Sequence, residues 1–223
     1  MIGEVNTAWY GSVMTKDLTI SLPERYGSST NRDTSRHALL LTLDPGLHAA
    51  EIANRLKEEG ILPPMIVAVR TEDSTADASE LLAHVISTHR VLEVPEARWV
   101  CGTGHSAAEA LRTVLNRPDL AGRAACLSTA FEGAEGAPPL HSRLLQELDE
   151  SDTLPTVKLF LDYGTSGIDE CYEPYHRDAG AIFREKGWSQ GAQFEIRRVA
   201  GGAHTPDSWS ERLEPALRWL AGH

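Results

Sequence analysis

The sequence lacks the features that mark several large classes of protein. Among its 223 residues, 21 lysines and arginines face 32 aspartates and glutamates, which gives a net charge of −11. Because nucleic acids and anionic membranes require a basic face, we expect neither as a partner. No apolar run reaches the length of a membrane-spanning helix, and we see no basic, apolar signal peptide.

Cysteine is also scarce. The three cysteines, Cys101, Cys126 and Cys171, are odd in number, and two of them lie in apolar runs. This pattern predicts reduced, mostly buried thiols in a cytoplasmic protein rather than a disulfide framework. The sequence has no H-E-x-x-H, C-x-x-C or Walker A motif, so we expect no metal, no cofactor and no phosphoryl transfer.

What the chain does contain is an alternation of short apolar runs with segments of helical periodicity. This alternation predicts an α/β fold, with a mostly parallel sheet that carries helices on both faces, and one domain over residues 1–223. The expected strands are 17–23, 38–43, 65–69, 99–101, 124–127, 157–161 and 194–199. The expected helices are 48–59, 77–89, 104–115, 142–148, 176–186 and 208–220, the last starting late or kinking around Pro215, and the expected loops include 24–35, 131–139 and 162–173.

The most informative stretch is 98–115, where an apolar run meets two glycines and then a helical pattern. Within it, Gly104-His105-Ser106-Ala107-Ala108 resembles the G-x-S-x-G nucleophile elbow, in which a strained turn holds a serine above a sheet. Ala108 stands where glycine is usual. We interpret Ser106 as a nucleophile.

Two other interpretations of this stretch remain open. Serine is favoured at helix starts, so Ser106 could simply cap the helix. The letters Gly102 to Ala107 also read as G-x-G-x-x-A, a dinucleotide-binding pattern. That pattern needs an acidic residue near the end of the next strand, and none comes before Glu132, which disfavours it.

A serine needs a base to take its proton and an acid to orient that base. His204 follows a predicted strand on a Gly-Gly-Ala turn, which favours it as the general base. Among the carboxylates after the strand 157–161, we favour Asp169, then Glu170, then Asp162; a Ser–His pair without an acid is also possible. The chain order of serine, acid and histidine is typical of α/β-hydrolases.

An oxyanion intermediate needs two backbone N–H groups directed at one point. The first is expected from Ala107, the residue after Ser106. The second is expected from the loop after strand 38–43, where Pro45 has no N–H and Gly46 or Leu47 must donate.

Taken together, these residues make the chain resemble the putative-esterase family of α/β-hydrolases, which includes esterase D-like, feruloyl esterase-like and enterochelin esterase-like enzymes and the mycolyltransferases. The resemblance covers nearly the whole chain in order, through the segments 18–23, 43–46, 104–108, 161–165 and 201–204, and then Trp209. It implies a hydrolase with little or no lid. The departures are Ala108, Pro45, and the Ser166-Gly167 that separates Gly164-Thr165 from the candidate acid.

The resulting hypothesis is a serine hydrolase that cleaves a small-molecule carboxylic ester or thioester through an acyl-enzyme on Ser106. Two alternatives use the same fold. One is an acyltransferase or thioesterase of a biosynthetic pathway, and the other is a catalytically silent binding protein, because a fold alone does not fix function.

Overall fold

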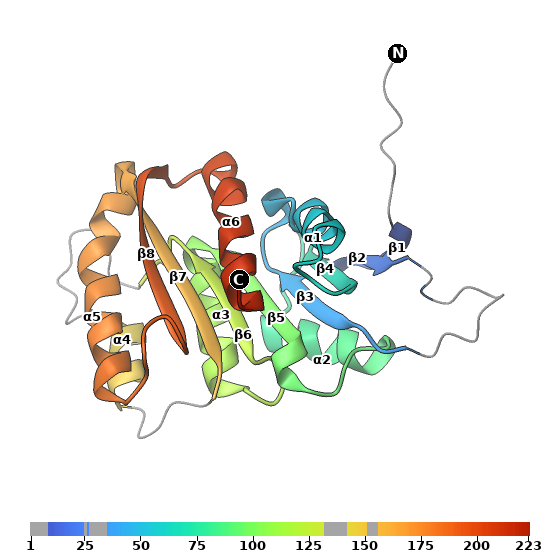
Figure 1. Ribbon diagram of the computed structural model, residues 1–223, viewed down its shortest axis with the longest axis horizontal. Helices are drawn as coiled ribbons and strands as arrows, with labels where there is room; N and C mark the ends of the chain where they lie inside the picture. Colours follow the sequence, from blue (N-terminus) through green and yellow to red (C-terminus); the bar gives the residue numbers. More distant parts are fainter. Residues whose placement is uncertain (1–8, 25, 27–34, 132–141, 151–155) are drawn as a thin grey trace, which may run out of the picture.

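In the described part of the chain, eight strands form a single sheet in the order β1-β2-β4-β3-β5-β6-β7-β8 (Figure 1). The computed structural model describes residues 9–24, 26, 35–131, 142–150 and 156–223, so the expected loops 24–35 and 131–139 lie largely outside the described residues. Strand β2 pairs antiparallel with both β1 and β4, and all the other neighbouring strands in the sheet pair parallel. The strands are β1 (Trp9–Met14), β2 (Leu18–Pro23), β3 (Ala38–Thr42), β4 (Met65–Arg70), β5 (Arg98–Thr103), β6 (Arg123–Leu127), β7 (Lys158–Ser166) and β8 (Phe194–Ala203).

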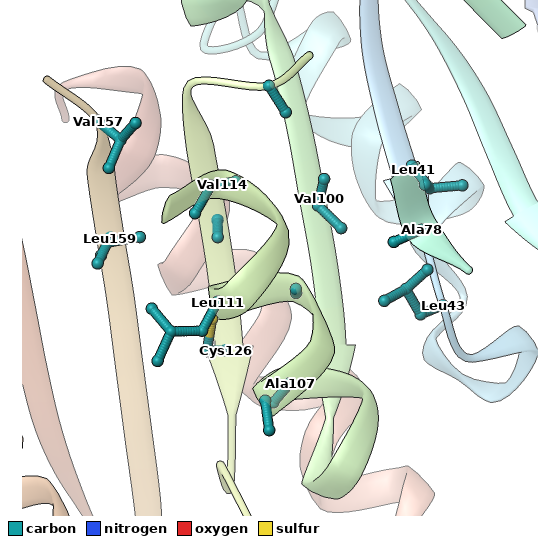
Figure 2. Close-up of a cluster of buried hydrophobic side chains, with 14 of the residues drawn as sticks. Leu41, Leu43, Ala78, Val100, Ala107, Leu111, Val114, Cys126, Val157 and Leu159 are labelled. Atoms are coloured by element: carbon teal, nitrogen blue, oxygen red, sulfur yellow. The ribbon is translucent and has the colours of Figure 1, made fainter. Parts of the chain in front are cut away.

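The helices cover the sheet in two layers, because successive strand residues point to opposite faces. Leu40 packs with α1 and α6 on one face, whereas Leu39 and Leu41 belong to the core under α2, α3, α4 and α5 on the other. Figure 2 shows side chains of α3 packed against strand residues in this second core. The helices are α1 (Ala49–Glu58), α2 (Ala78–Thr88), α3 (Gly104–Asn116), α4 (Arg143–Glu150), α5 (Glu173–Glu185) and α6 (Pro206–Ala221), with 3₁₀ turns η1 (Pro45–Leu47), η2 (Pro95–Ala97) and η4 (Gly167–Tyr172).

The expected α/β architecture is confirmed, with differences at the edges of elements. The two last strands are longer than predicted: β7 runs to Ser166, so the expected loop 162–173 begins as strand, and β8 runs to Ala203. Close approach explains the extension of β7, because a Cβ on Gly164 would lie 2.1 Å from the carbonyl oxygen of Gly202. Only glycine allows the two strands to meet there.

The helix α6 begins at Pro206 and runs through Pro215 to Ala221, rather than starting late. Proline suits the first turn of a helix, where its missing N–H has no partner to lose. Buried neighbours such as Leu213 and Leu217 hold the helix together past Pro215. Strand β1 was not expected, and it pairs with β2 at the edge of the sheet.

Helix α2 starts at a capping box, as its sequence indicates. The Asp77 side chain accepts from the Glu80 backbone N–H at 2.9 Å, and the Glu80 side chain accepts from the Asp77 N–H at 3.3 Å. Among the described residues, no helix is long and apolar enough to cross a membrane.

Gly102 offers a test of the packing between β5 and α3. A Cβ on Gly102 would lie 2.5 Å from the backbone carbonyl carbon and oxygen of Ser106. We expect Gly102→Ala to lower the free energy of unfolding by about 2 kcal/mol or more, as overpacking does. Urea denaturation measures this loss. The control is Gly46→Ala, whose Cβ would make an ordinary contact at 3.8 Å with Pro206, and an equal loss in both variants would contradict the account.

Candidate active site

The carboxyl ends of the central strands bring a group of polar residues to one edge of the sheet. In parallel sheets this edge is where functional side chains gather. The register aligns Thr103 at the end of β5 with Leu127 of β6, and Leu127 with Asp162 of β7. The residues that lie at or beyond the strand ends are Asp44, Arg70, Gly104, Ser128, Asp169 and His204.

Asp169 and His204 form a direct pair. The Oδ1 atom of Asp169 lies 2.7 Å from the Nδ1 atom of His204. The Asp169 side chain is fully buried, whereas 28% of the His204 side chain is exposed. Edge-on packing by Trp209 and Tyr172, with ring centroids 4.6 Å and 5.8 Å from that of His204, fixes the imidazole plane. The pair thus has the geometry of a base and its orienting acid.

Four hydrogen bonds keep the Asp169 carboxylate ionised. Besides His204, its partners all donate to Oδ2: the Ser128 hydroxyl at 2.5 Å, the Gly164 N–H at 2.9 Å and the Arg212 guanidinium at 3.3 Å. Burial alone would raise the pKa of Asp169, but these hydrogen bonds outweigh it and hold the pKa below its usual value.

The other two candidate acids lie elsewhere. Asp162 is buried within β7, where its carboxylate accepts from Arg212 and from the Ser128 N–H. Glu170 follows Asp169 in η4, but it is exposed. Of the three carboxylates predicted from the sequence, the structure brings only Asp169 to His204.

The turn between β5 and α3 lies at Gly104, not at Ser106. The strand ends at Thr103, the helix begins at Gly104, and Gly104 has a φ of +53°. Ser106, in the first turn of α3, is not among the residues with positive φ. The sequence prediction that centred the elbow on Ser106 is therefore wrong by two residues. A Cβ on Gly104 would lie 3.4 Å from both Nε2 and Cε1 of His204.

Ser106 instead belongs to a network on the other side of the turn. Its hydroxyl accepts from Nη2 of Arg70 at 3.1 Å and forms a hydrogen bond with Asp44. Burial raises the pKa of Asp44, an effect that the hydrogen bonds from the Thr103 N–H and from Ser106 only partly offset. In the described part of the chain, no hydrogen bond joins Ser106 to His204.

Sequence reasoning missed the position of the turn because two registers of the same letters fit. The pattern G-x-S-x-A starts at Gly104, whereas the structure aligns the elbow with Gly102-Thr103-Gly104-His105-Ser106. Gly102 is the residue that could have distinguished the two registers. The backbone of Ser106 approaches it so closely that only glycine, which has no Cβ, fits there.

The backbone amides around the turn also differ from expectation. Because α3 begins at Gly104, the N–H of Ala107 makes the first backbone hydrogen bond of the helix, to the carbonyl four residues earlier. The expected oxyanion donor therefore already has a partner. The amide that follows the turn residue is that of His105. In the loop after β3, the Leu47 N–H bonds to the carbonyl of Asp44 at 3.4 Å, and Gly46 lies between them in η1.

A pocket of about 360 Å³ lies along α3, and neither Asp169 nor His204 lines it. Of the described residues, it is lined by His105 and Glu109 and by parts of α2 and α3, but not by His204. The pair at the strand ends, rather than this pocket, therefore defines the candidate active site.

Arg212 of α6 anchors the buried side of the site and was not foreseen from the sequence. Its guanidinium lies 3.0 Å from Asp162 Oδ1 and 3.3 Å from Asp169 Oδ2, and it donates to the Ser128 hydroxyl at 2.8 Å. The same guanidinium donates to the carbonyl of Ala203, next to His204. One cation therefore holds β7, β8 and the acid together.

We expect Arg212→Met to lower the free energy of unfolding by about 3–5 kcal/mol, because it leaves two buried carboxylates without their cation. Thermal or urea denaturation measures the loss. Arg218→Met on the same helix removes two more exposed pairs, with Glu59 and Glu214, and should cost about 1 kcal/mol or less. Similar losses in the two variants would contradict the role given to Arg212.

His176 of α5 lies beneath the site, fully buried against Phe131 and Tyr163. Burial lowers its pKa to about 4. The unfolded chain, with a histidine pKa of about 6.5, therefore binds a proton between about pH 6.5 and 4 that the folded chain does not. This contribution to stability is present above pH 6.5 and is lost as the pH falls to 4.

We expect His176→Phe to lose about 3 kcal/mol less stability than the parent between pH 7 and pH 4, at 1.36 kcal/mol per pKa unit. Urea denaturation at a series of pH values measures this difference. Parallel curves for His176→Phe and the parent would show that His176 has no such effect.

Comparison with known proteins was informative only at the level of structure. Neither a protein-family model nor a curated protein matches the chain. A structure described as a ferulic acid esterase matches with a TM-score of 0.70 and 16% identity, over 95% of both chains. S-formylglutathione hydrolase (FrmB) from Staphylococcus aureus matches with a TM-score of 0.67 and 16% identity, over 95% of this chain and 96% of its own.

The ferric enterobactin esterase (fes) from Salmonella typhimurium matches with a TM-score of 0.73 and 18% identity, over 96% of this chain. The chain spans only 59% of the length of that protein. These identities establish a common fold and no more. The chain has the α/β-hydrolase fold of this group of esterases, as the sequence resemblance predicted.

Proposed function

We propose that the protein binds a small carboxylic ester or thioester at the sheet edge above Gly104 and hydrolyses it with His204 as the general base. The observation that carries this proposal is the 2.7 Å contact between Asp169 Oδ1 and His204 Nδ1, with His204 Nε2 next to Gly104. A buried acid behind a partly exposed imidazole is the arrangement that general-base catalysis needs.

Asp169 fixes the tautomer of the imidazole. Because Nδ1 donates to the carboxylate, Nε2 carries the lone pair on the side of Gly104. Nε2 then takes the proton of the attacking oxygen and returns it to the leaving oxygen or sulfur. The lowered pKa of Asp169 supports a carboxylate that stays ionised and stabilises the imidazolium as it forms.

The oxyanion would be held by backbone amides on both sides of the turn. We propose His105 N–H as the first donor, because it follows the turn residue, in place of Ala107. For the second donor, Gly46 is favoured over Leu47, whose N–H already bonds to Asp44. Each donor in such a site contributes roughly 100-fold or more to turnover.

The substrate class is supported by the neighbours in structure. Those reported above are described as a ferulic acid esterase, a ferric enterobactin esterase and an S-formylglutathione hydrolase. Carbonyl compounds with a leaving oxygen or sulfur are therefore the first substrates to test. A short-chain aryl ester is the simplest probe.

A second candidate function is ligand binding without turnover. It is favoured by one observation, namely that the residue facing His204 at the turn is a glycine and offers no side-chain nucleophile. On this alternative, the site would bind an ester or its carboxylate product and release it unchanged. Titration calorimetry with the ester and with the carboxylate, run beside the turnover assay, separates the two functions.

We expect His204→Ala and Asp169→Asn each to lower kcat/KM for p-nitrophenyl acetate by about 100-fold or more, the usual contribution of a general base. A stopped colorimetric assay measures the loss. Glu170→Gln serves as the matched control, since Glu170 is the exposed neighbour of Asp169, and it should leave turnover within about twofold of the parent.

Turnover that survives both His204→Ala and Asp169→Asn would overturn the proposal. Binding without turnover in the parent protein would establish the second candidate instead.

A further inference from the structure

We infer that Gly104 occupies the nucleophile position of this fold, so that the attacking oxygen is a water molecule and the substitution Gly104→Ser alone creates a covalent serine hydrolase. The part that concerns water rests on the proposed function. The part that concerns the substitution rests on geometry alone.

The turn itself is the first observation. In α/β-hydrolases the nucleophile sits on the sharp, strained turn between strand and helix. Between β5 and α3 this conformation occurs at Gly104, with φ +53°. With 3.6 residues per turn, a residue two positions later points about 200° away around the helix axis. Ser106 accordingly faces Arg70 and Asp44.

The glycine at the start of the elbow is the second observation. A Cβ on Gly102 would collide with the Ser106 carbonyl at 2.5 Å, so the first position of the elbow must be glycine. In the sequence Gly102-Thr103-Gly104-His105-Ser106, the required glycine comes two residues before Gly104. This spacing is that of G-x-S-x-G, with glycine in place of the nucleophilic serine and with Ser106 in place of the last glycine.

The position of His204 is the third observation. Among the described residues, and apart from its chain neighbours and the nearby backbone of α3, the atoms within 4 Å of a Cβ on Gly104 are Nε2 and Cε1 of His204, both at the van der Waals distance of 3.4 Å. A hydroxyl lies one bond beyond Cβ and would donate a hydrogen bond to the lone pair of Nε2. The base is thus directed at a side chain that the residue lacks.

In the parent protein, the hydrolytic step balances with water alone. The water oxygen forms a bond to the carbonyl carbon while Nε2 of His204 takes its proton. The tetrahedral intermediate then breaks its bond to the leaving oxygen or sulfur, which receives the proton from His204. The products are the free acid and the alcohol or thiol, and no acyl group is bound to the chain.

In Gly104→Ser the same base serves a different nucleophile. The introduced hydroxyl gives its proton to Nε2 and forms a bond to the carbonyl carbon, and the alcohol leaves with that proton. Water then attacks the acyl-enzyme by the same route and releases the acid. A fluorophosphonate traps the first step, because the hydroxyl displaces fluoride from phosphorus and His204 takes the proton.

The experiment compares labelling by a fluorophosphonate in four proteins, namely the parent, Gly104→Ser, Gly104→Ala, and Gly104→Ser combined with His204→Ala. Gly104→Ala is the matched control, since it adds the same Cβ at the same positive φ without a hydroxyl. Intact mass spectrometry measures the adduct, peptide mapping gives its position, and thermal melting confirms folding. We expect an adduct at position 104 in the two proteins that carry Gly104→Ser and in neither of the others. The adduct should form at least about 100-fold more slowly when His204→Ala is also present.

Two results would overturn the inference. One is an adduct on Ser106 in the parent protein. The other is a folded Gly104→Ser that labels no faster than Gly104→Ala. If Gly104→Ser does not melt cooperatively, the variant Ser106→Ala tests the inference instead. Ester hydrolysis by Ser106→Ala within about threefold of the parent supports an external nucleophile. A loss of 100-fold or more shows that Ser106 is the nucleophile. A parent that hydrolyses no ester while Gly104→Ser is labelled refutes the proposed function and the role of water, and it confirms that Gly104 occupies the nucleophile position.

Discussion

The contact between Arg212 and two buried carboxylates is the interaction on which the site depends. Asp162 lies on β7, and Asp169 lies on the 3₁₀ turn η4 that follows it. Burial of two negative charges so near each other would lower the stability of the folded chain. Arg212 compensates for both, and Ser128 completes the arrangement by accepting from Arg212 and Trp209 while donating to Asp169. The polar groups that orient the acid therefore come from three places in the chain, namely helix α6, the residue that follows β6, and β7.

The helix α6 consequently controls both halves of the pair. Arg212 contacts Asp169 both directly and through Ser128, whereas Trp209 reaches it through Ser128 and also packs edge-on against His204. Ser128 can do this because its φ of +47° turns the chain sharply after β6. Such a conformation in a residue other than glycine is strained, and strain of this kind is often retained where geometry must be precise.

Much of the fold could be predicted from the sequence, because the spacing of apolar residues indicates the alternation of buried strands and amphipathic helices. The pairing of Asp169 with His204 was also within reach, since both follow strands in the expected order. The turn at Gly104 could not be predicted, because the sequence has glycines at both 102 and 104 and does not indicate which of them has the positive φ. Contacts such as those of Arg212, which join residues distant in sequence, could not be predicted without the fold.

The glycine at the turn has a consequence for the order in which reactants meet. A serine in that place would store the acyl group on the chain, so that donor and acceptor could visit the site one after the other, with ping-pong kinetics. Gly104 offers nothing on which to store it. Any transfer to an alcohol or amine at this site would thus require both partners to be bound together, and its initial-rate plots would intersect rather than run parallel.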